Sequence, residues 1–265
     1  MALNQTDISW CDFTLNPAAG CSPVSPGCAN CYAAEQAAVV ARRFREIRPD
    51  DARKYMELAT VKPGRTNWTG SVALFPERMD APRKRKKPAI IFLGSMTDLL
   101  YEQIPEDFLW RIVSMIRECP QHTFMVLTKR EHRLPWLNGT MLATGGWPSN
   151  LYMGCTVESQ DHVGRVTALQ AIRANRRFLS VEPMLGPITF PDLTGIHLVI
   201  TGGESGNNFR PFNPAWASAV RDQCAAAGVA FHHKQNGGRN PSGNYLLDGM
   251  EYRAMPERGL ASGKV

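Results

Sequence analysis

Three cysteines with unequal spacing are the residues of this sequence with the clearest chemical capacity. Cys21, Cys28 and Cys31 lie in the segment CSPVSPGCANCYAAEQ, where two prolines and a glycine precede a run typical of a helix. Thiolates are the ligands of soft metal sites and of iron–sulfur clusters. Three thiolates placed just before a helix therefore indicate a metal centre.

Three interpretations of these thiols compete. They could be free thiols in a loop. They could bind a structural zinc ion, since Cys28-x-x-Cys31 has zinc-knuckle spacing, but such a site takes four ligands, and Cys11 or a distant histidine would have to complete it. They could instead bind a [4Fe–4S] cluster through three thiolates, which leaves one iron open to a substrate or a cofactor.

The elements that must position the thiols follow from short apolar, β-branched runs that alternate with helical patterns. Strands are expected at 8–15, 71–75, 89–94, 123–128, 151–157, 177–181, 197–201 and 229–233. Helices are expected at 29–44, 105–119, 160–175 and 214–227. The last helix has the clearest limits, because Asn213 suits its N-cap, Pro214 its first position and Gly228 its end.

This alternation predicts an α/β fold of parallel βα units. Eight strands in 265 residues fit a TIM-like (β/α) barrel, complete or partial, and a doubly wound open sheet is the alternative. We expect residues 1–240 to form the barrel domain, with an insertion at about 48–70, where Pro, Gly and charged residues are frequent. Residues 241–265 would be a C-terminal tail.

Polar residues and glycines cluster just after the expected strands. They are Thr97, Asp98, Lys129, Thr156, Glu158, Glu182, Gly202, Gly203 and Glu204. In a barrel these strand ends meet on one rim, the face where such folds place their chemistry, and the cysteines would join them after the first strand. Each residue taken singly could equally be a loop or cap residue.

The charge balance favours an anionic partner. Lys and Arg number 30 against 24 Asp and Glu, a net charge of +6, and the densest basic run is Arg83, Lys84, Arg85, Lys86 and Lys87. Such a run is either a solvated loop or a contact to nucleic-acid phosphates. No signal-like segment and no apolar run of about 20 residues is present, so we expect a cytoplasmic protein without membrane contact.

With these residues in place, the sequence resembles the radical S-adenosylmethionine (SAM) superfamily. Within it, the chain is similar to a family frequent in phages and prophages whose motif is close to WNPxxGCxxxSPGCxxCYA. The matching segments are LNPAAGC (15–21), SPGC (25–28), CYA (31–33), FLGSMTDLL (92–100), VLTKR (126–130), GCTVES (154–159), SVEPMLGP (180–187) and TGGESG (201–206).

The resemblance implies that Cys21, Cys28 and Cys31 bind a [4Fe–4S] cluster whose open iron is chelated by SAM. An electron donor such as a flavodoxin or ferredoxin would drive cleavage of SAM to a 5′-deoxyadenosyl radical, which abstracts hydrogen from the substrate. The order of motifs is also distantly similar to that of spore photoproduct lyase.

That comparison places several residues at SAM. Thr97, Asp98, Lys129 and Thr156 occupy positions like those that hold SAM, with Lys129 at its carboxylate. Glu158, Glu182 or Glu204 could bond its ribose hydroxyls or amino group, and each could equally be a helix-cap or loop carboxylate. Gly202 and Gly203 could let the backbone approach a ligand, but a strand-to-helix turn explains two glycines just as well.

Two departures from these relatives matter. The usual cysteine pattern is CxxxCxxC, whereas six residues separate Cys21 from Cys28, and Ser95 stands where the lyase has its hydrogen-donating cysteine. The resemblance still implies a radical SAM enzyme, an isomerase or a lyase, that modifies or rearranges a nucleic-acid base in phage DNA. The competing hypothesis is a non-catalytic, zinc-stapled nucleic-acid-binding protein.

Overall fold

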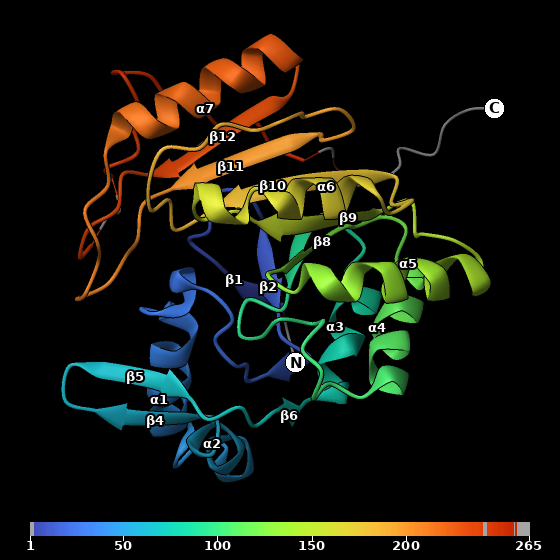
Figure 1. The fold of residues 1–265 in the computed structure, drawn as a ribbon. Helices are drawn as coiled ribbons and strands as arrows, with labels where there is room; N and C mark the ends of the chain where they lie inside the picture. The colour runs from blue at the N-terminus through green and yellow to red at the C-terminus, as the bar shows by residue number, and fades with distance from the viewer. Residues whose placement is uncertain (1–2, 241–242, 257, 259–265) are drawn as a thin grey trace.

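A curved sheet forms the centre of the molecule. The computed structural model describes residues 3–240, 243–256 and 258 (Figure 1). The sheet has eight strands in the order β1-β2-β7-β8-β9-β10-β11-β12. Their bounds are Asn4–Gln5 (β1), Phe13–Leu15 (β2), Ile90–Leu93 (β7), Thr123–Thr128 (β8), Leu151–Thr156 (β9), Arg176–Val181 (β10), Leu198–Gly202 (β11) and Ala230–Gln235 (β12).

The sheet is a half-barrel. Within this sheet β2 and the strands from β7 to β12 run parallel in chain order, and only β1 is antiparallel to its neighbour. Within the described residues β12 pairs with neither β1 nor β2, so the complete barrel is not formed. A doubly wound sheet is excluded too, because it needs a reversal of strand order that this sheet does not have.

Helices cover the outer face of the curved sheet (Figure 1). They are α4 (Glu106–Glu118), α5 (Leu134–Ala143), α6 (Gly164–Gln170) and α7 (Pro214–Ala227). The strands alternate accordingly: Ile91 and Leu93 pack in the core beneath the helices, whereas Ile90 and Phe92 face an inner cluster with Trp10. None of the helices in the described part of the chain is long and apolar enough to cross a bilayer.

Three expected elements differ from the structure. Of the expected strand 8–15, only Phe13–Leu15 (β2) is a strand. The expected strand 71–75 is only Ala73–Leu74 (β6), paired with Ala18–Ala19 (β3) outside the main sheet. Of its apolar residues, Ala73 and Phe75 join a separate core, whereas Val72 and Leu74 pack against the main one. The expected helix 160–175 is a short 3₁₀ turn (η4, Gln160–His162) followed by α6, which ends at Gln170.

The region expected to be an insertion is an ordered module beside the cysteine loop. It contains α2 (Pro49–Met56) and the antiparallel hairpin of β4 (Ala59–Lys62) and β5 (Arg65–Trp68). These pack on α1 (Tyr32–Phe44) through a core of small and aromatic residues. The remaining short elements are η1 (Pro26–Cys28), η2 (Pro76–Met79), α3 (Asp80–Lys84) and η3 (Glu131–Arg133).

Residues after β12 cover the open side of the half-barrel. Arg253 forms an isolated bridge with His232 and donates to the Ser9 hydroxyl at 2.9 Å. Arg258 forms an ion pair with Asp12 at 2.9 Å. The described part of the expected tail therefore links the last strand to the N-terminal segment; its residues 241–242, 257 and 259–265 lie outside the described residues.

The close contact between β9 and β10 yields a test of the inner core. A Cβ at Gly154 would lie 2.4 Å from a ring carbon of the fully buried Phe178, so Gly154→Ala should lower the free energy of unfolding by about 1–3 kcal/mol. Gly164 is the matched control, because it begins a helix and a Cβ there would meet nothing within 4 Å. Gly164→Ala should be neutral or stabilising by less than about 1 kcal/mol in urea denaturation. Equal effects of the two substitutions would contradict this packing.

Candidate functional site

The three cysteines line one cavity at the carboxyl ends of the strands from β7 to β9. The same cavity is lined by Thr97, Asp98, Lys129 and Thr156, so the structure brings together seven of the residues singled out in the sequence. Aromatic and apolar side chains complete its wall: Tyr32, Trp68, Phe92 and Leu127. Trp68 comes from the hairpin, which therefore contributes directly to the cavity.

The cysteine loop is fixed at its start by a glycine. Gly20 has φ +104°, and a Cβ there would lie 2.1 Å from the carbonyl oxygen of Ser71. Its main-chain N–H donates to Met96 O at 3.0 Å, and its carbonyl accepts from the Thr97 hydroxyl at 2.6 Å. Thr97, which was expected to contact SAM, thus holds the loop that carries Cys21 against the end of β7.

The cysteine environments differ. Cys31 is the N-cap of α1. The Cys28 thiol lies 3.8 Å from the Ser25 hydroxyl. Burial, reinforced by the nearby Asp98 carboxylate and opposed by Arg130, raises the pKa of the Cys21 thiol to about 11. Ligation of Cys21 to a metal would therefore displace a proton.

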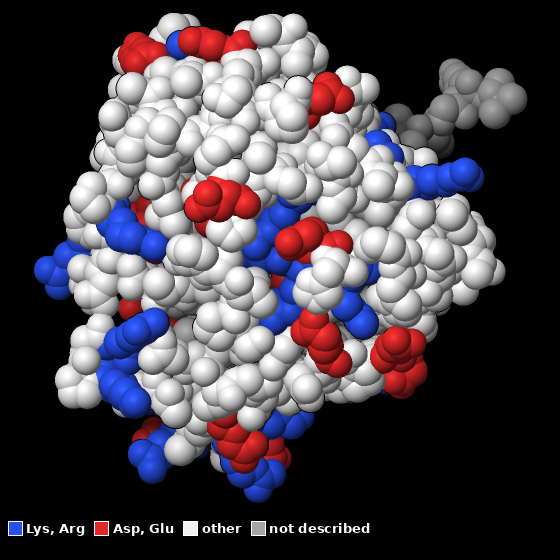
Figure 2. All heavy atoms as spheres, in the orientation of Figure 1, with Lys and Arg blue, Asp and Glu red and all other residues white. Residues whose placement is uncertain are grey.

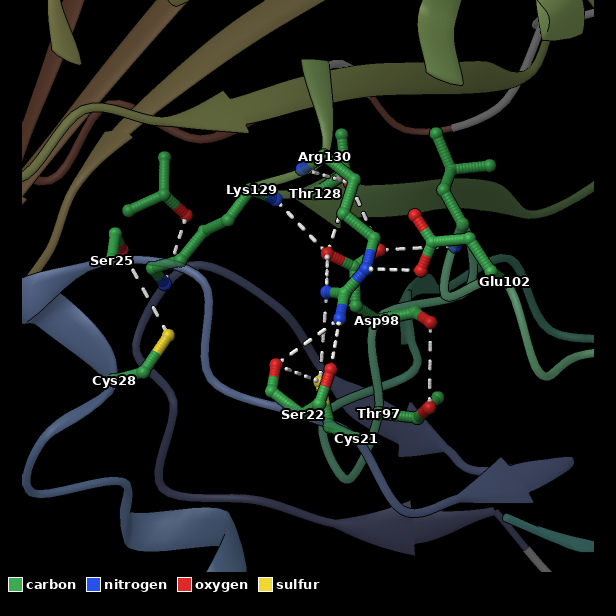
Figure 3. A network of polar contacts seen from close by, with 12 residues as sticks. Cys21, Ser22, Ser25, Cys28, Thr97, Asp98, Glu102, Thr128, Lys129 and Arg130 are labelled. Atoms are coloured by element: carbon green, nitrogen blue, oxygen red, sulfur yellow. Dashed lines mark hydrogen bonds and ion pairs between the residues drawn. The ribbon is translucent and has the colours of Figure 1, made fainter. Parts of the chain in front are cut away.

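Asp98 organises the end of β8. Its carboxylate accepts from the Thr128 hydroxyl at 2.9 and 3.0 Å, from the Lys129 main-chain N–H at 3.0 Å and from Leu100 N–H at 3.0 Å (Figure 3). It also forms an ion pair with Arg130 at 3.2 Å. Both oxygens are therefore engaged within the protein, and the predicted contact of Asp98 with SAM remains only a prediction.

Arg130 is the functional residue that the sequence did not reveal. It is 1% exposed, and its guanidinium contacts the Cys21 sulfur at 3.7 Å and the Ser22 hydroxyl at 2.9 Å (Figure 3). It belongs to the segment VLTKR, but a buried arginine and an exposed one look the same in a sequence. Only the fold shows that Arg130 is buried and bonded to the cysteine loop, although both it and its neighbour Lys129 line the cavity.

Lys129 is a cation available at the cavity. Its Nζ lies 3.4 Å from the Thr156 hydroxyl. Within the residues that the structure describes, no carboxylate lies within ion-pair distance of it, and it lines the cavity with the three cysteines. An ammonium in this position, beside a polar hydroxyl, is suited to bind an anionic group.

The three glutamates expected at SAM have partners within the protein and do not line the cavity. Glu158 is buried and forms an ion pair with Arg165 at 2.8 Å. Glu182 pairs with Lys234 at 3.1 Å, and Glu204 with Arg210 at 2.5 Å. Burial alone would raise the pKa of both Glu158 and Glu204. The Ser25 hydroxyl and Arg165 nevertheless hold the pKa of Glu158 below its ordinary value. Arg210 and Asn30 likewise lower the pKa of Glu204.

These carboxylates nevertheless support the site. A Cβ at Gly27, inside the cysteine loop, would lie 3.1 Å from Glu158, so this side chain packs directly beneath the loop. Glu204 accepts from Asn30 Nδ2 at 3.0 Å, and Arg210 donates to Pro26 O at 3.0 Å. Glu158 and Glu204 thus tie the loop to the ends of β9 and β11.

Gly202 and Gly203 are explained by packing. A Cβ at Gly202 would lie 2.6 Å from Glu182 Oε1, which crosses over β11 to reach Lys234 on β12. A Cβ at Gly203 would lie 2.8 Å from the backbone of Asn236. Neither glycine lines the cysteine cavity, so their predicted role at a cofactor has no geometric support in the described residues.

The basic run lies at the opposite edge of the sheet. Arg83 and Lys84 end α3, and Arg85, Lys86 and Lys87 precede the amino end of β7, whereas the cysteine cavity lies at the carboxyl ends. Arg83 is paired with Glu118 at 2.6 Å, and the Arg85 guanidinium lies 4.5 Å from the Phe13 ring centroid. These residues cannot contact the part of a substrate that enters the cavity.

Basic side chains are also present nearer the cavity. Figure 2 shows Lys and Arg at the left edge of the face and in its middle, interspersed with acidic residues. The hairpin tip is flanked by the exposed Lys62 and Arg65. Gly64 O in this tip accepts from Asn208 Nδ2 at 2.7 Å, and Asn208 O accepts from Asn30 at 2.8 Å. The hairpin tip therefore joins the loop that borders the cysteines.

Comparison with known proteins assigns the family. The family model described as "Protein of unknown function (DUF5131)" matches residues 5–256. The chain belongs to the DUF5131 family. No curated protein is significantly similar to it in sequence.

Solved structures of spore photoproduct lyase are weakly similar to this DUF5131 protein. The lyase complexed with dinucleoside spore photoproduct matches with 11% identity and a TM-score of 0.41, covering 83% of this chain and 62% of that chain. A lyase mutant with bound AdoMet and dinucleoside spore photoproduct matches with 10% identity and a TM-score of 0.41, covering 86% of this chain and 64% of that chain. This chain thus spans less than two thirds of either lyase.

The buried Asp98–Arg130 pair predicts a large stability difference. Asp98→Ala would remove the buried one of the two carboxylates that pair with Arg130 and leave only Glu102, whose side chain is 44% exposed, so it should cost about 3–5 kcal/mol in the free energy of unfolding. The control is Asp50→Ala, which removes a pair whose side chains are 75% and 88% exposed and should cost less than about 1 kcal/mol. Urea denaturation measures both, and a small loss for Asp98→Ala would show that the pair does not stabilise the fold.

Proposed function

We propose that this protein is a radical SAM enzyme in which Cys21, Cys28 and Cys31 hold a [4Fe–4S] cluster. The observation that carries the proposal is the lining of one cavity by three cysteines and by the ammonium of Lys129. Three thiolates leave one iron of the cluster open, and a cation beside that iron suits a ligand that carries a carboxylate. SAM is such a ligand.

The donor set fits a cluster better than a zinc ion. A structural zinc site takes four ligands, whereas a [4Fe–4S] cluster with one open iron takes three thiolates. Three cysteines, and no histidine among the described residues, line the cavity.

The zinc-stapled alternative also needs a fourth ligand. The candidates were Cys11 and a distant histidine, and Cys11 is buried in the inner core cluster, where its thiol lies 3.8 Å from Ile8 O. No observation favours the non-catalytic function.

When bound, the cluster and SAM would supply an electron and a 5′-deoxyadenosyl radical that abstracts hydrogen from a substrate. The chain's own residues bind, orient and exclude water. Lys129 would hold the SAM carboxylate with Thr156 beside it. The apolar wall of Phe92, Leu127 and Trp68 would keep water from the cavity. A flavodoxin- or ferredoxin-type donor is part of the proposal.

For the substrate we propose a nucleic-acid base, modified or rearranged by an isomerase- or lyase-type reaction in the cytoplasm of a phage host. The net charge of +6 supports an anionic substrate, and Lys62 and Arg65 lie on the hairpin that borders the cavity. Ser95 lines the cavity and bonds to Asn16 at 2.9 Å. A hydroxyl is a poor hydrogen-atom donor, so Ser95 would not supply the hydrogen atom that a cysteine thiol at this position could supply.

The ligand assignment is tested by iron content. Cys28→Ala leaves two of the three thiolates, so the variant reconstituted without oxygen should lose most of its iron, sulfide and absorption near 400 nm. Cys224→Ala is the matched control, because Cys224 is fully buried in α7 away from the cavity. It should keep wild-type iron content. Full iron and sulfide in Cys28→Ala would overturn the assignment.

The role of Lys129 is tested by SAM affinity. Its loss would remove the cation at the SAM carboxylate and should cost about 2 kcal/mol, which is a roughly thirtyfold weaker Kd. Lys129→Ala should keep its cluster and bind SAM correspondingly weakly in anaerobic calorimetry. Lys84→Ala, at the opposite edge of the sheet, should bind SAM like the wild type. Unchanged affinity in Lys129→Ala would remove this residue from the SAM site.

A further inference from the structure

The side chain of Arg130 lines the cavity and contacts the cysteine loop. Its Nη1 donates to the Cys21 sulfur at 3.7 Å, and its Nη2 donates to the Ser22 carbonyl at 3.1 Å and to the Ser22 hydroxyl at 2.9 Å (Figure 3). The two segments are 109 residues apart in sequence. Among the three cysteines, only Cys21 has a hydrogen bond from a charged side chain in the described residues.

The guanidinium has little freedom to leave this position. Its Nε donates to Glu102 at 3.1 Å, and its Nη1 donates also to Asp98 at 3.2 Å. Its central carbon lies 4.5 Å from the ring centroid of Tyr101. All three nitrogens are thus used, and the rigid fork of an arginine, unlike a lysine, satisfies them together.

This arrangement bears on electron transfer. The reduction potential of an iron–sulfur cluster depends on the net charge around it, on hydrogen bonds to its sulfurs and on solvent exposure. Reduction adds a negative charge, so a buried cation bonded to a ligand sulfur stabilises the reduced form. Arg130 is 1% exposed, so solvent screens its charge little.

We infer that Arg130 is a positioning residue that raises the reduction potential of the cluster through its hydrogen bond to the Cys21 ligand. The inference rests on the proposed function, since it requires a cluster bound by Cys21. It adds a role that neither the cysteine motif nor the SAM-binding residues supply: Arg130 makes the cluster easier to reduce by a weak physiological donor.

Glu102 provides a comparison of opposite sign. Its carboxylate bonds to the same guanidinium without a hydrogen bond to the cysteine loop, and its side chain is 44% exposed. If charge sets the potential, removal of this negative charge should raise the potential, and solvent screening should make the shift smaller than that of Arg130. A merely structural role would instead loosen the loop in both variants and shift both potentials in the same direction.

The experiment is an anaerobic redox titration of the reconstituted protein, followed by electron paramagnetic resonance. Arg130→Gln should lower the midpoint potential by the equivalent of about a tenfold change in the reduction equilibrium, or about 59 mV for one electron. Arg130→Lys keeps the positive charge but not the planar fork of the guanidinium. Its midpoint potential should lie between those of the wild type and Arg130→Gln. Glu102→Gln should shift the potential upward.

Ser22→Ala is the matched control. It removes one anchor of the loop to Arg130 but keeps the guanidinium beside the sulfur, so its potential should equal that of the wild type. An equal downward shift in Ser22→Ala and Arg130→Gln, or a downward shift in Glu102→Gln, would overturn the inference. If Arg130→Gln does not fold, Arg130→Lys and Glu102→Gln decide by the opposite signs of their shifts.

The outcomes separate the inference from the proposed function. A wild-type protein that takes up no cluster after reconstitution would contradict the proposed function. A wild-type cluster with a measurable potential that Arg130→Lys and Glu102→Gln leave unchanged would contradict only the role of Arg130.

Discussion

The buried ion pair of Asp98 and Arg130 is the interaction on which the site depends. Asp98 follows β7, Arg130 follows β8, and the guanidinium also bonds to the loop that follows β3. Removing two charges from water is costly, and the cost is offset only where geometry is close and the remaining hydrogen bonds are made. Here both groups meet that condition, so three segments distant in sequence are held in one arrangement before any ligand binds.

The same constraint explains why so many polar residues at the strand ends have internal partners. A loop with prolines and glycines has little regular hydrogen bonding of its own, so its position must come from its surroundings. Glu158 packs beneath Gly27, and Arg210, held by Glu204, bonds to Pro26. Carboxylates at the carboxyl ends of the strands can therefore position the cysteine loop instead of contacting a bound molecule. Residue type alone does not distinguish the two roles.

The sequence predicted the parallel strands well, because residues such as those of Thr123–Thr128 are apolar on both faces of a covered sheet. It failed at 71–75, where Ala73 and Phe75 join a small separate core while Val72 and Leu74 pack against the main one. In the site, the sequence was sufficient to predict that the three cysteines and Lys129 lie at one cavity. Arg130 was missed, since burial of a charge is decided by tertiary contacts that periodicity does not contain.

The distribution of charge restricts how a large substrate can approach. Parallel strands place the cysteine cavity and the basic run 83–87 at opposite edges of one sheet, so a nucleic acid that reaches the cavity is contacted there by other residues. The hairpin meets this requirement, because Trp68 lines the cavity while Lys62 and Arg65 remain exposed at its tip. Phosphate contacts by such residues position a chain without reading its sequence. If the proposed substrate is correct, selection of one base would arise inside the cavity, where the space is bounded by Tyr32, Phe92 and Trp68.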